Sequence, residues 1–503
     1  MRRLIATALP LRALGDRRFG PAALALLAGV LAARASAQPV TDPDAPWIAA
    51  LGRELLATGH APRVNGWSFT APSQPWVAHE WGLSPLYALA LSRFGPWGAS
   101  LLGAVGASLT LGLLLRLTLL RARRRAVGVG LAFASLLVLR EAIFSPRPAC
   151  VTLALPLAAA ALLLRPALTR AHALASVALT VAWANLHGSF PLAAMIAAAG
   201  VVAFDDRRGL RVATAFGCAL APLCNPYGPR LYALVFDYAA GGATTHALRG
   251  ALAEFQPLWR APAPWSDLAI VAALGSLVAL SLGRIASRPR SVAWVSLGLC
   301  AMALSQARHV ALALTLGLAL CVSAADDALD RLLRGLDAAL HPPEDGPRGL
   351  ELWRRATAWC VAAIALGALA GRAAPTSGQV ARALGGDGLR ALVDGAAGAR
   401  VVVPFAASGW ALWWGLPRGA RVFYDARNDC YPEAVARAAF ALEGGASLDR
   451  VEASRVELVM APEGHALAEA ARRDARWVVS ARSGAWSRWE RVSDAGRRRP
   501  TRR

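Results

Sequence analysis

Apolar stretches separated by short arginine-rich segments occupy most of the chain. A helix needs about 20 apolar residues to cross a bilayer, and somewhat fewer where the membrane is thin. By that measure the pattern predicts about eleven membrane-spanning helices, of which two are short enough to fit re-entrant segments as well. Their approximate ranges are 19–37, 96–120, 126–140, 149–164, 171–185, 189–204, 212–224, 266–283, 292–306, 309–324 and 356–371.

From about residue 373 the pattern changes to short apolar runs separated by helix-like stretches. Such runs are typical of strands, and their alternation with helices predicts a small α/β domain. Neither a G-x-G-x-x-G nor a P-loop sequence occurs there, so nothing supports nucleotide binding. The predicted strands are "ARVVVPF" (399–405), "ARVFY" (420–424), "VELVMA" (456–461) and "RWVVS" (476–480).

Composition agrees with a polytopic, mainly α-helical membrane protein. Hydrophobic residues make up 56% of the 503, charged residues only 17%, and the mean hydropathy is +0.41, which is too apolar for an ordinary soluble protein. The formal charge is +22, and arginine supplies all of the side-chain positive charge because lysine does not occur. These arginines cluster in loops between spans, as positive charge does on the cytoplasmic side of membranes. We therefore expect contact with membrane lipid and no nucleic acid partner.

The arginine distribution also predicts orientation. We expect 1–18 to be a cytoplasmic basic N-terminus. Residues 19–372 then form a multi-span membrane domain with a large first external loop at 38–95, and 373–503 form an external (periplasmic) α/β domain with a basic tail. Signal-peptidase cleavage after Ala37 is the alternative for the first span, but Arg34 interrupts its apolar run, which favours an uncleaved helix.

Cysteine usage gives no sign of a metal site or a disulfide framework. The seven cysteines lie mostly inside or beside apolar runs, without the spacing that either would need. We interpret them as small core residues, except that Cys430 stands alone in a polar region.

Polar and ionisable residues gather in loops that this orientation places outside. Such groups are costly at membrane depth and normally face a protein interior or a water-filled cavity, so their shared level predicts one pocket. The segments are "HEW" (79–81), "REAIFSPRP" (140–148), "NLHGSF" (185–190), "NPYGPRLY" (225–232) and "QARH" (306–309).

Each segment also has a purely structural interpretation. "NPYG" fits a turn that ends a helix, and His187 fits a satisfied interfacial histidine. Arg140 and Arg147 fit snorkelling to headgroups, or an ion pair with Glu80. The aromatic belt of a membrane interface is a further interpretation, and it applies to Trp76, Trp81 and Trp183.

At these motifs the chain resembles the GT-C superfamily of membrane glycosyltransferases. More closely, it is similar to a set of uncharacterised bacterial polytopic membrane proteins described as GT-C-like. The similarity runs over about residues 40–432 and is carried by "PWVAHEWGLSPLYAL" (75–89), "SPRPACVTLALPL" (145–157), "WANLHGSFPL" (183–192), "CNPYGPRLY" (224–232), "ARHVAL" (307–312) and "VFYDARNDCY" (422–431).

The resemblance implies a multi-pass protein of the bacterial inner (plasma) membrane. Its expected activity is transfer of a sugar from a polyprenyl-phosphate donor to an acceptor at the external face. Familiar loops of that superfamily carry an acidic pair or an aspartate near the start of the loop. Here the acidic candidates are Glu80, Asp42 and Asp44, which depart from that pattern.

Such a transfer needs a carboxylate to take the acceptor's proton, donors to hold the leaving phosphate, and a groove for the lipid. We expect Glu80 to be the base. His79 has three open roles: orienting Glu80, relaying a proton, or binding a divalent cation beside it. The expected substrate-binding residues are Arg140, Arg147, His187, Asn225, Tyr227, Arg308 and His309.

In the C-terminal domain, "DARNDCY" (425–431) is expected to cap a strand, with Asp425 and Arg427 at its carboxyl end. Loops at that end of a sheet are where α/β folds bind ligands. A turn-stabilising Asp425–Arg427 pair is the favoured interpretation, with acceptor binding as the alternative.

Two other classes of function stay open. A non-catalytic relative would keep the fold to bind a lipid-linked glycan, which the unfamiliar acidic pattern favours. A secondary transporter has less support, because the polar candidates gather at one face rather than at the midplane, and no pair of broken helices occupies corresponding halves.

Overall fold

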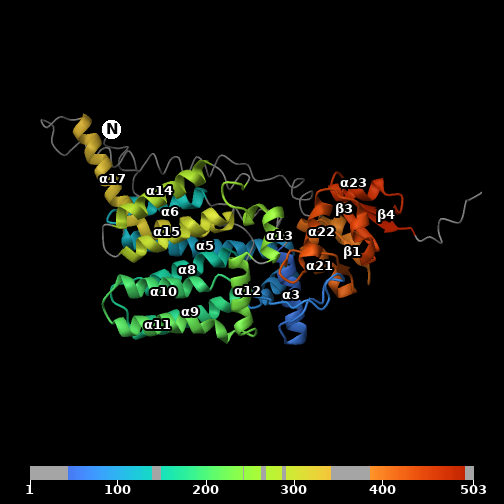
Figure 1. Cartoon of the computed structure of the whole chain (residues 1–503), viewed down its shortest axis with the longest axis horizontal. Coiled ribbons are helices and arrows are strands. Elements are labelled where there is room, and N and C mark those ends of the chain that lie inside the picture. The colour runs from blue at the N-terminus through green and yellow to red at the C-terminus, as the bar shows by residue number, and fades with distance from the viewer. Residues whose placement is uncertain are drawn as a thin grey trace, which may run out of the picture. The chain divides into compact units, whose positions relative to one another are not determined.

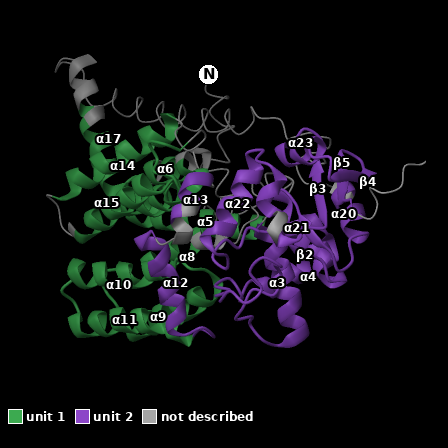
Figure 2. Cartoon of the chain, turned by 45° about the vertical axis from the view of Figure 1, so that its right-hand side comes forward, with its two compact units in different colours: residues 1–36, 103–224, 252–374 green, residues 37–102, 225–251, 375–503 purple. Residues whose placement is uncertain are grey.

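The computed structural model describes residues 44–138, 149–241, 243–261, 268–285, 290–340 and 386–492. These residues form two compact units (Figure 2). Unit 1 contains those within 103–224 and 252–374, and unit 2 contains those within 37–102, 225–251 and 375–503.

Unit 1 is built from apolar helices (Figure 1). They coincide with the candidate spans predicted between residues 96 and 324. Bounds are α5 (Pro96–Arg121, which begins in unit 2), α6 (Arg125–Val138), α8 (Ala149–Leu163), α9 (Arg170–Leu186), α10 (Pro191–Ala203), α11 (Arg208–Leu220), η2 (Ala221–Cys224), η3 (Ala253–Phe255), α14 (Leu268–Ile285), α15 (Arg290–Ser305), η4 (Ala307–His309), α16 (Val310–Leu312), η5 (Ala313–Gly317) and α17 (Leu318–Leu340).

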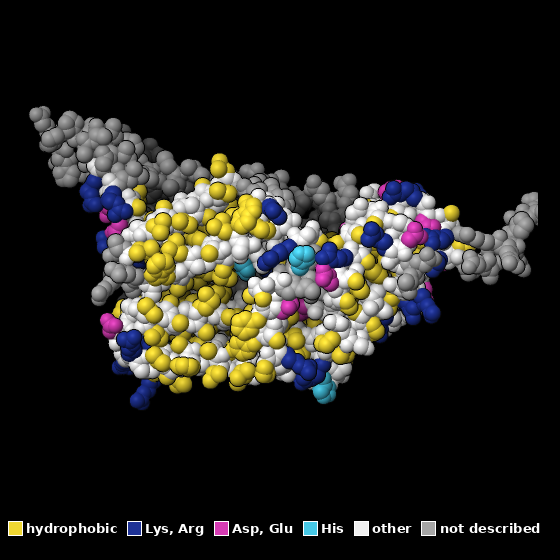
Figure 3. Space-filling model, in the orientation of Figure 1, with side chains coloured by type: hydrophobic (Ala, Val, Ile, Leu, Met, Phe, Trp, Pro, Cys, Tyr) yellow, Lys and Arg dark blue, Asp and Glu magenta, His cyan; other side chains and the backbone are white. Residues whose placement is uncertain are grey.

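Large hydrophobic side chains are exposed on unit 1. Figure 3 shows them spread over its helices, and Leu268 and Phe216 are 83% and 66% exposed. Lipid tolerates such a surface, whereas water does not. Among the described helices, α5, α14 and the run 307–331 are long and apolar enough to cross a membrane. The mainly helical, apolar architecture is therefore confirmed, while the number of spans stays a prediction.

Paired charges hold two arginine-rich loops of unit 1. Arg211 is buried and binds the Asp206 carboxylate as well as backbone carbonyls of the loop between α8 and α9. Asp326 of α17 accepts hydrogen bonds from the backbone N–H groups of Arg123 and Arg124. These loops are therefore packed against helices rather than free.

The C-terminal part of unit 2 is a mixed five-stranded sheet with strand order β2-β1-β3-β5-β4. β1 (Arg400–Val402) pairs in parallel with β2 (Arg421–Val422) and β3 (Leu458–Pro462), whereas β5 (Trp486–Arg491) pairs antiparallel with β3 and β4 (Trp477–Ser483). Its helices are α20 (Gly386–Asp394), η6 (Phe405–Ala407), α21 (Ser408–Gly415), η7 (Leu416–Arg418), α22 (Glu433–Glu443), η8 (Leu448–Ser454) and α23 (Ala466–Arg473). The predicted mixture of helices and strands is confirmed.

The rest of unit 2 consists of helices from earlier in the chain. They are α3 (Asp44–Thr58), α4 (Ser84–Phe94), α12 (Pro229–Ala240) and α13 (Ala243–Ala251). α3 is tied to α21, because the Arg53 guanidinium donates to the carbonyl of Trp413 at 2.8 Å and lies 4.4 Å from the centre of its ring. α3 also packs closely on the start of α4 at Gly52.

Gly52 provides a test of this packing. A Cβ at this position would lie 1.9 Å from the backbone oxygen of Ser84, so Gly52→Ala must push α3 and α4 apart. We expect a loss of about 1–3 kcal/mol in unfolding free energy, measured as a lower Tm of the detergent-solubilised protein. Gly66→Ala is the matched control, because a Cβ there meets nothing within 4 Å. Equal melting of the two variants would contradict the packing described.

Candidate functional site

The segment between α3 and α4 folds onto the edge of the sheet beside β2. Ser68 forms a parallel bridge with Val422, whose N–H donates to the carbonyl of Trp67 at 3.2 Å. The Thr70 hydroxyl donates to the carbonyl of Phe423 at 2.6 Å. A segment of the first loop thus extends the C-terminal sheet.

The same segment places His79 and Glu80 directly before α4. Val64 and Pro75 form an antiparallel bridge, and tight turns follow in which the N–H of Leu83 donates to the carbonyl of Glu80 at 3.1 Å. Glu80 is 8% exposed and His79 is half-buried. A buried carboxylate in a short structured turn has a fixed position, as a general base requires.

Arg427 is the central side chain of the neighbouring segment from the C-terminal domain. Its Nε and Nη2 donate to the two carboxylate oxygens of Asp425, each at 2.8 Å, and Nη2 also donates to Oδ1 of Asn65 at 2.7 Å. Both charged side chains are fully buried. Burial disfavours the guanidinium charge, but the neighbouring Asp425 carboxylate raises the pKa of Arg427 well above its ordinary value.

Aromatic rings enclose this guanidinium. Arg427 Cζ lies 4.3 Å from the ring centre of Trp67 and 4.5 Å from that of Trp76, and the two tryptophans pack edge to face. Trp76 is 3% exposed and Trp183 is fully buried. The interpretation of these two tryptophans as members of an aromatic belt is therefore wrong, because their rings fill protein interior.

Asn65 joins the two segments through its side-chain amide. Its Nδ2 donates to the carbonyl of Cys430 at 3.1 Å, while its Oδ1 accepts from the N–H of Trp67 as well as from Arg427. Asn65 is fully buried, so these hydrogen bonds replace contacts with water. Sequence reasoning did not single out Asn65.

His79 lies between two carboxyl groups. Its Nε2 is 3.9 Å from Oε1 of Glu80, and its Nδ1 is 4.0 Å from Oδ2 of Asp429. Burial raises the pKa of the Asp429 carboxyl to about 8, against the opposing effect of Arg427. Asp429 was not among the residues predicted from the sequence, which were Asp425 and Arg427. Its position as a second acidic residue, four residues after Asp425 in the same polar segment, could have indicated it.

Tyr227 and Asn225 lie in unit 2 with this cluster. The Tyr227 hydroxyl donates to the carbonyl of Pro62 at 2.8 Å, and Oδ1 of Asn225 accepts from the N–H of Tyr227 at 3.0 Å. Burial raises the pKa of Tyr227 to about 12, and Asp429 is one of the charges that act on it. "NPYG" thus forms a turn, and Tyr227 is fixed against the loop that carries His79.

The remaining described candidates belong to unit 1. Nδ1 of His187 accepts from the N–H of Ser189 at 3.1 Å, which ends α9 and leads into α10. Arg308 lies over the ring of Phe255, 4.6 Å from its centre, and His309 ends η4. Each has a local structural contact, and their roles toward a substrate stay predictions.

Three candidates, Arg140, Arg147 and Asp42, lie outside the described residues. Asp44 is in the first turn of α3, where Oδ1 accepts a hydrogen bond from Nε1 of Trp47 at 3.0 Å. That contact gives Asp44 a helix-starting role.

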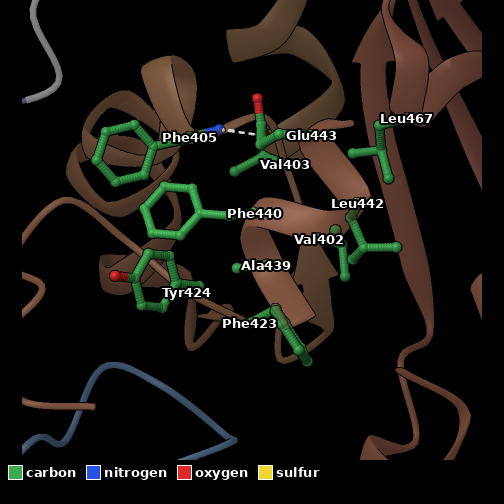
Figure 4. Close-up of a pocket in the computed structure, with 10 residues that line it drawn as sticks. All are labelled: Val402, Val403, Phe405, Phe423, Tyr424, Ala439, Phe440, Leu442, Glu443 and Leu467. Atoms are coloured by element: carbon green, nitrogen blue, oxygen red, sulfur yellow. Dashed lines mark hydrogen bonds between the residues drawn. The ribbon is translucent and has the colours of Figure 1, made fainter. Parts of the chain in front are cut away.

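A second feature of unit 2 is an aromatic slot beyond the carboxyl ends of β1 and β2 (Figure 4). The rings of Phe405 and Tyr424 stack 6.1 Å apart, and Phe440 packs against both. Glu443 accepts the N–H of Phe405 and lies 3.4 Å from Nε2 of His465. These side chains satisfy one another, as in a domain core.

No group of three or more His, Cys, Asp or Glu side chains is arranged to hold a metal ion within the part of the chain that the structure describes. His79, Glu80 and Asp429 supply the ionisable groups of the cluster. Carboxyl and imidazole groups of this kind can accept and donate protons.

Comparison with solved structures identifies the fold. The crystal structure of ArnT from Cupriavidus metallidurans in the apo state is similar over 95% of this chain and 99% of that chain, with a TM-score of 0.53 and 13% sequence identity. No protein-family model and no curated protein sequence matches the chain. ArnT is a GT-C glycosyltransferase, so the predicted GT-C-like fold is confirmed.

The buried Asp425–Arg427 pair predicts a loss of stability rather than of ligand affinity. Asp425→Asn removes the charge that compensates a fully buried guanidinium, which typically costs about 3–5 kcal/mol, so Tm should fall sharply. Asp449→Asn is the control, since that side chain is exposed and pairs with Arg476 at the surface. Normal melting of Asp425→Asn with weaker acceptor binding would instead favour the acceptor-binding hypothesis.

Proposed function

We propose that the protein is an integral-membrane glycosyltransferase that transfers a sugar from a polyprenyl-phosphate donor to an acceptor at the external membrane face. The similarity to the fold of ArnT, a GT-C glycosyltransferase, supports this class of reaction. The apolar helices of unit 1 support a membrane-embedded enzyme that receives a lipid-linked substrate.

The observation that carries the proposal is the buried His79–Glu80 pair. Glu80 is a carboxylate held in a structured turn, with an imidazole nitrogen 3.9 Å away. The acceptor hydroxyl oxygen would attack the anomeric carbon while Glu80 takes its proton. The bond from that carbon to the phosphate oxygen breaks, and the lipid phosphate leaves with the electron pair.

The leaving phosphate needs cationic and neutral donors. Arg140, Arg147, Arg308 and His309 are proposed for this role because guanidinium groups match phosphate geometry. His187, Asn225 and Tyr227 are proposed to contact the sugar or the lipid headgroup. Binding of a divalent cation by His79 is a further proposal. Measuring transfer with and without added divalent cations tests it.

The proposed topology has a cytoplasmic N-terminus, about eleven spans and an external domain over 373–503, in a bacterial inner membrane. Alkaline phosphatase fusions test it: a fusion after Val492 should be active and one after Arg123 inactive, because the arginine cluster at 121–125 is retained in the cytoplasm. A fusion after Arg208 is a second cytoplasmic control. Activity of all three fusions would contradict the topology.

Replacing Glu80 tests the proposed base. Glu80→Gln keeps the shape of the side chain but removes the proton acceptor, so transfer should fall by about 10²–10⁴-fold while donor affinity stays unchanged. Arg147→Ala should instead weaken donor binding. Transfer is measured with purified protein, radiolabelled polyprenyl-phosphate sugar and extracted glycans. Glu463→Gln is the control, an exposed carboxylate in the same unit.

The outcomes separate the competing functions. Full transfer by Glu80→Gln would exclude this residue and point to Asp42 or Asp44. Donor binding without transfer by the wild-type protein would favour a non-catalytic glycan-binding protein. Substrate movement across proteoliposome membranes without covalent transfer would favour a transporter.

A further inference from the structure

We infer that Asp429 is a positioning residue that determines which ring nitrogen of His79 carries the proton, and through His79 orients Glu80. The inference rests on the proposed function of the His79–Glu80 pair. Oδ2 of Asp429 lies 4.0 Å from Nδ1 of His79, and Nε2 of His79 lies 3.9 Å from Oε1 of Glu80. Each nitrogen of the imidazole therefore faces one carboxyl group.

Because Asp429 and Glu80 are buried, their carboxyl groups strongly influence the tautomer of the His79 imidazole. The side chains of Asp429 and Glu80 are 4% and 10% exposed, and that of His79 is 24% exposed. Oδ2 of Asp429 is buried and has no hydrogen-bond partner among the described residues. Small side-chain rotations bring the two nitrogens to hydrogen-bond distance of the carboxyl groups. Because both carboxyl groups are nearly buried and one lies beside each ring nitrogen, they favour one tautomer over the other.

The protonation state of Asp429 determines which groups donate and which accept in the hydrogen bonds from Asp429 through His79 to Glu80. Its pKa is raised to about 8 by burial, so below that pH the carboxyl is neutral and can donate to Nδ1 of His79. The ring proton then sits on Nε2 and is donated to the Glu80 carboxylate. Above about pH 8 the Asp429 carboxylate draws the proton to Nδ1, and a lone pair of Nε2 faces Glu80 instead. Glu80 then loses the N–H of His79 as a donor.

Other titratable groups around Asp429 keep one charge state over this range. Arg427 stays charged, because its pKa is raised above the ordinary value of an arginine. Burial raises the pKa of Tyr227 to about 12, and that of Tyr424, Cys430 and Tyr431 well above their ordinary values, so these groups stay neutral. The Asp425 carboxyl oxygens accept two hydrogen bonds from the Arg427 guanidinium, so Asp425 is engaged with that side chain. Within this set, Asp429 is thus the group whose charge changes near pH 8.

The tautomer of His79 can be read directly from ¹⁵N NMR of the full-length protein in detergent, labelled at histidine. The His79 signal is identified by its loss in His79→Gln. The wild type should carry the proton on Nε2 below about pH 8 and on Nδ1 above it. Asp429→Asn should hold the proton on Nε2 throughout, because its amide donates as the neutral carboxyl does. Asp429→Leu should show a mixture of tautomers.

Asp449→Asn is the matched control, an aspartate of the same unit that pairs with Arg476 at the surface, and it should behave as the wild type. The same tautomer and the same pH response in the wild type and in Asp429→Leu would overturn the inference. A purely structural role for Asp429 predicts that result, so the measurement separates positioning from packing.

Transfer kinetics give a second, separable readout. Asp429→Leu should lower kcat by about tenfold or more with KM unchanged, because the partner that fixes the tautomer of the histidine is lost. In the wild type, kcat should decline above about pH 8, where the Asp429 carboxyl ionises. Asp429→Asn should retain the wild-type kcat at pH 7 and should not show this decline. A wild-type protein without transferase activity would contradict the proposed function while the NMR result still decides the role of Asp429. Transfer with a tautomer indifferent to Asp429 would overturn this inference alone.

Discussion

The buried guanidinium of Arg427 is the interaction on which the arrangement of unit 2 depends. It neutralises Asp425, donates to Asn65, and lies between the rings of Trp67 and Trp76. Because an unpaired buried charge is so costly, all of these contacts must form together. The first loop and the C-terminal domain are thereby held as one structure, and the turn with His79 and Glu80 follows directly from the residues that are clamped.

Asp425 and Asp429 are four residues apart, but their different surroundings give their carboxyl groups different roles. Asp425 accepts two hydrogen bonds from the guanidinium of Arg427, one from the backbone N–H of Arg427 and one from Tyr431, so its charge is compensated inside the protein. The side chain of Asp429 is 4% exposed, and here burial outweighs the effect of Arg427 and raises the pKa to about 8. One carboxyl is thus suited to holding the fold, and the other to holding or releasing a proton near neutral pH.

Much of the fold could be predicted from local pattern, because each apolar run with its flanking arginine-rich loops indicates one helix without any knowledge of tertiary contacts. β5 was missed because "WSRWER" has no apolar run, and its pairing with β3 is decided by tertiary context. At the site, His79 and Glu80 stood out as charges beside an apolar stretch. Asn65 and Asp429 did not, since they are separated by more than 360 residues and only folding brings their segments together.

The proposed function requires that the chain catalyse sugar transfer from a lipid phosphate. The most direct measurement follows radiolabel from a polyprenyl-phosphate sugar, in a single turnover with purified wild-type protein in excess over donor. The proposed function predicts that label leaves the lipid phase and appears covalently on an acceptor glycan, with release of one polyprenyl phosphate per sugar. Label that remains on the lipid while the protein binds the donor stoichiometrically would contradict it.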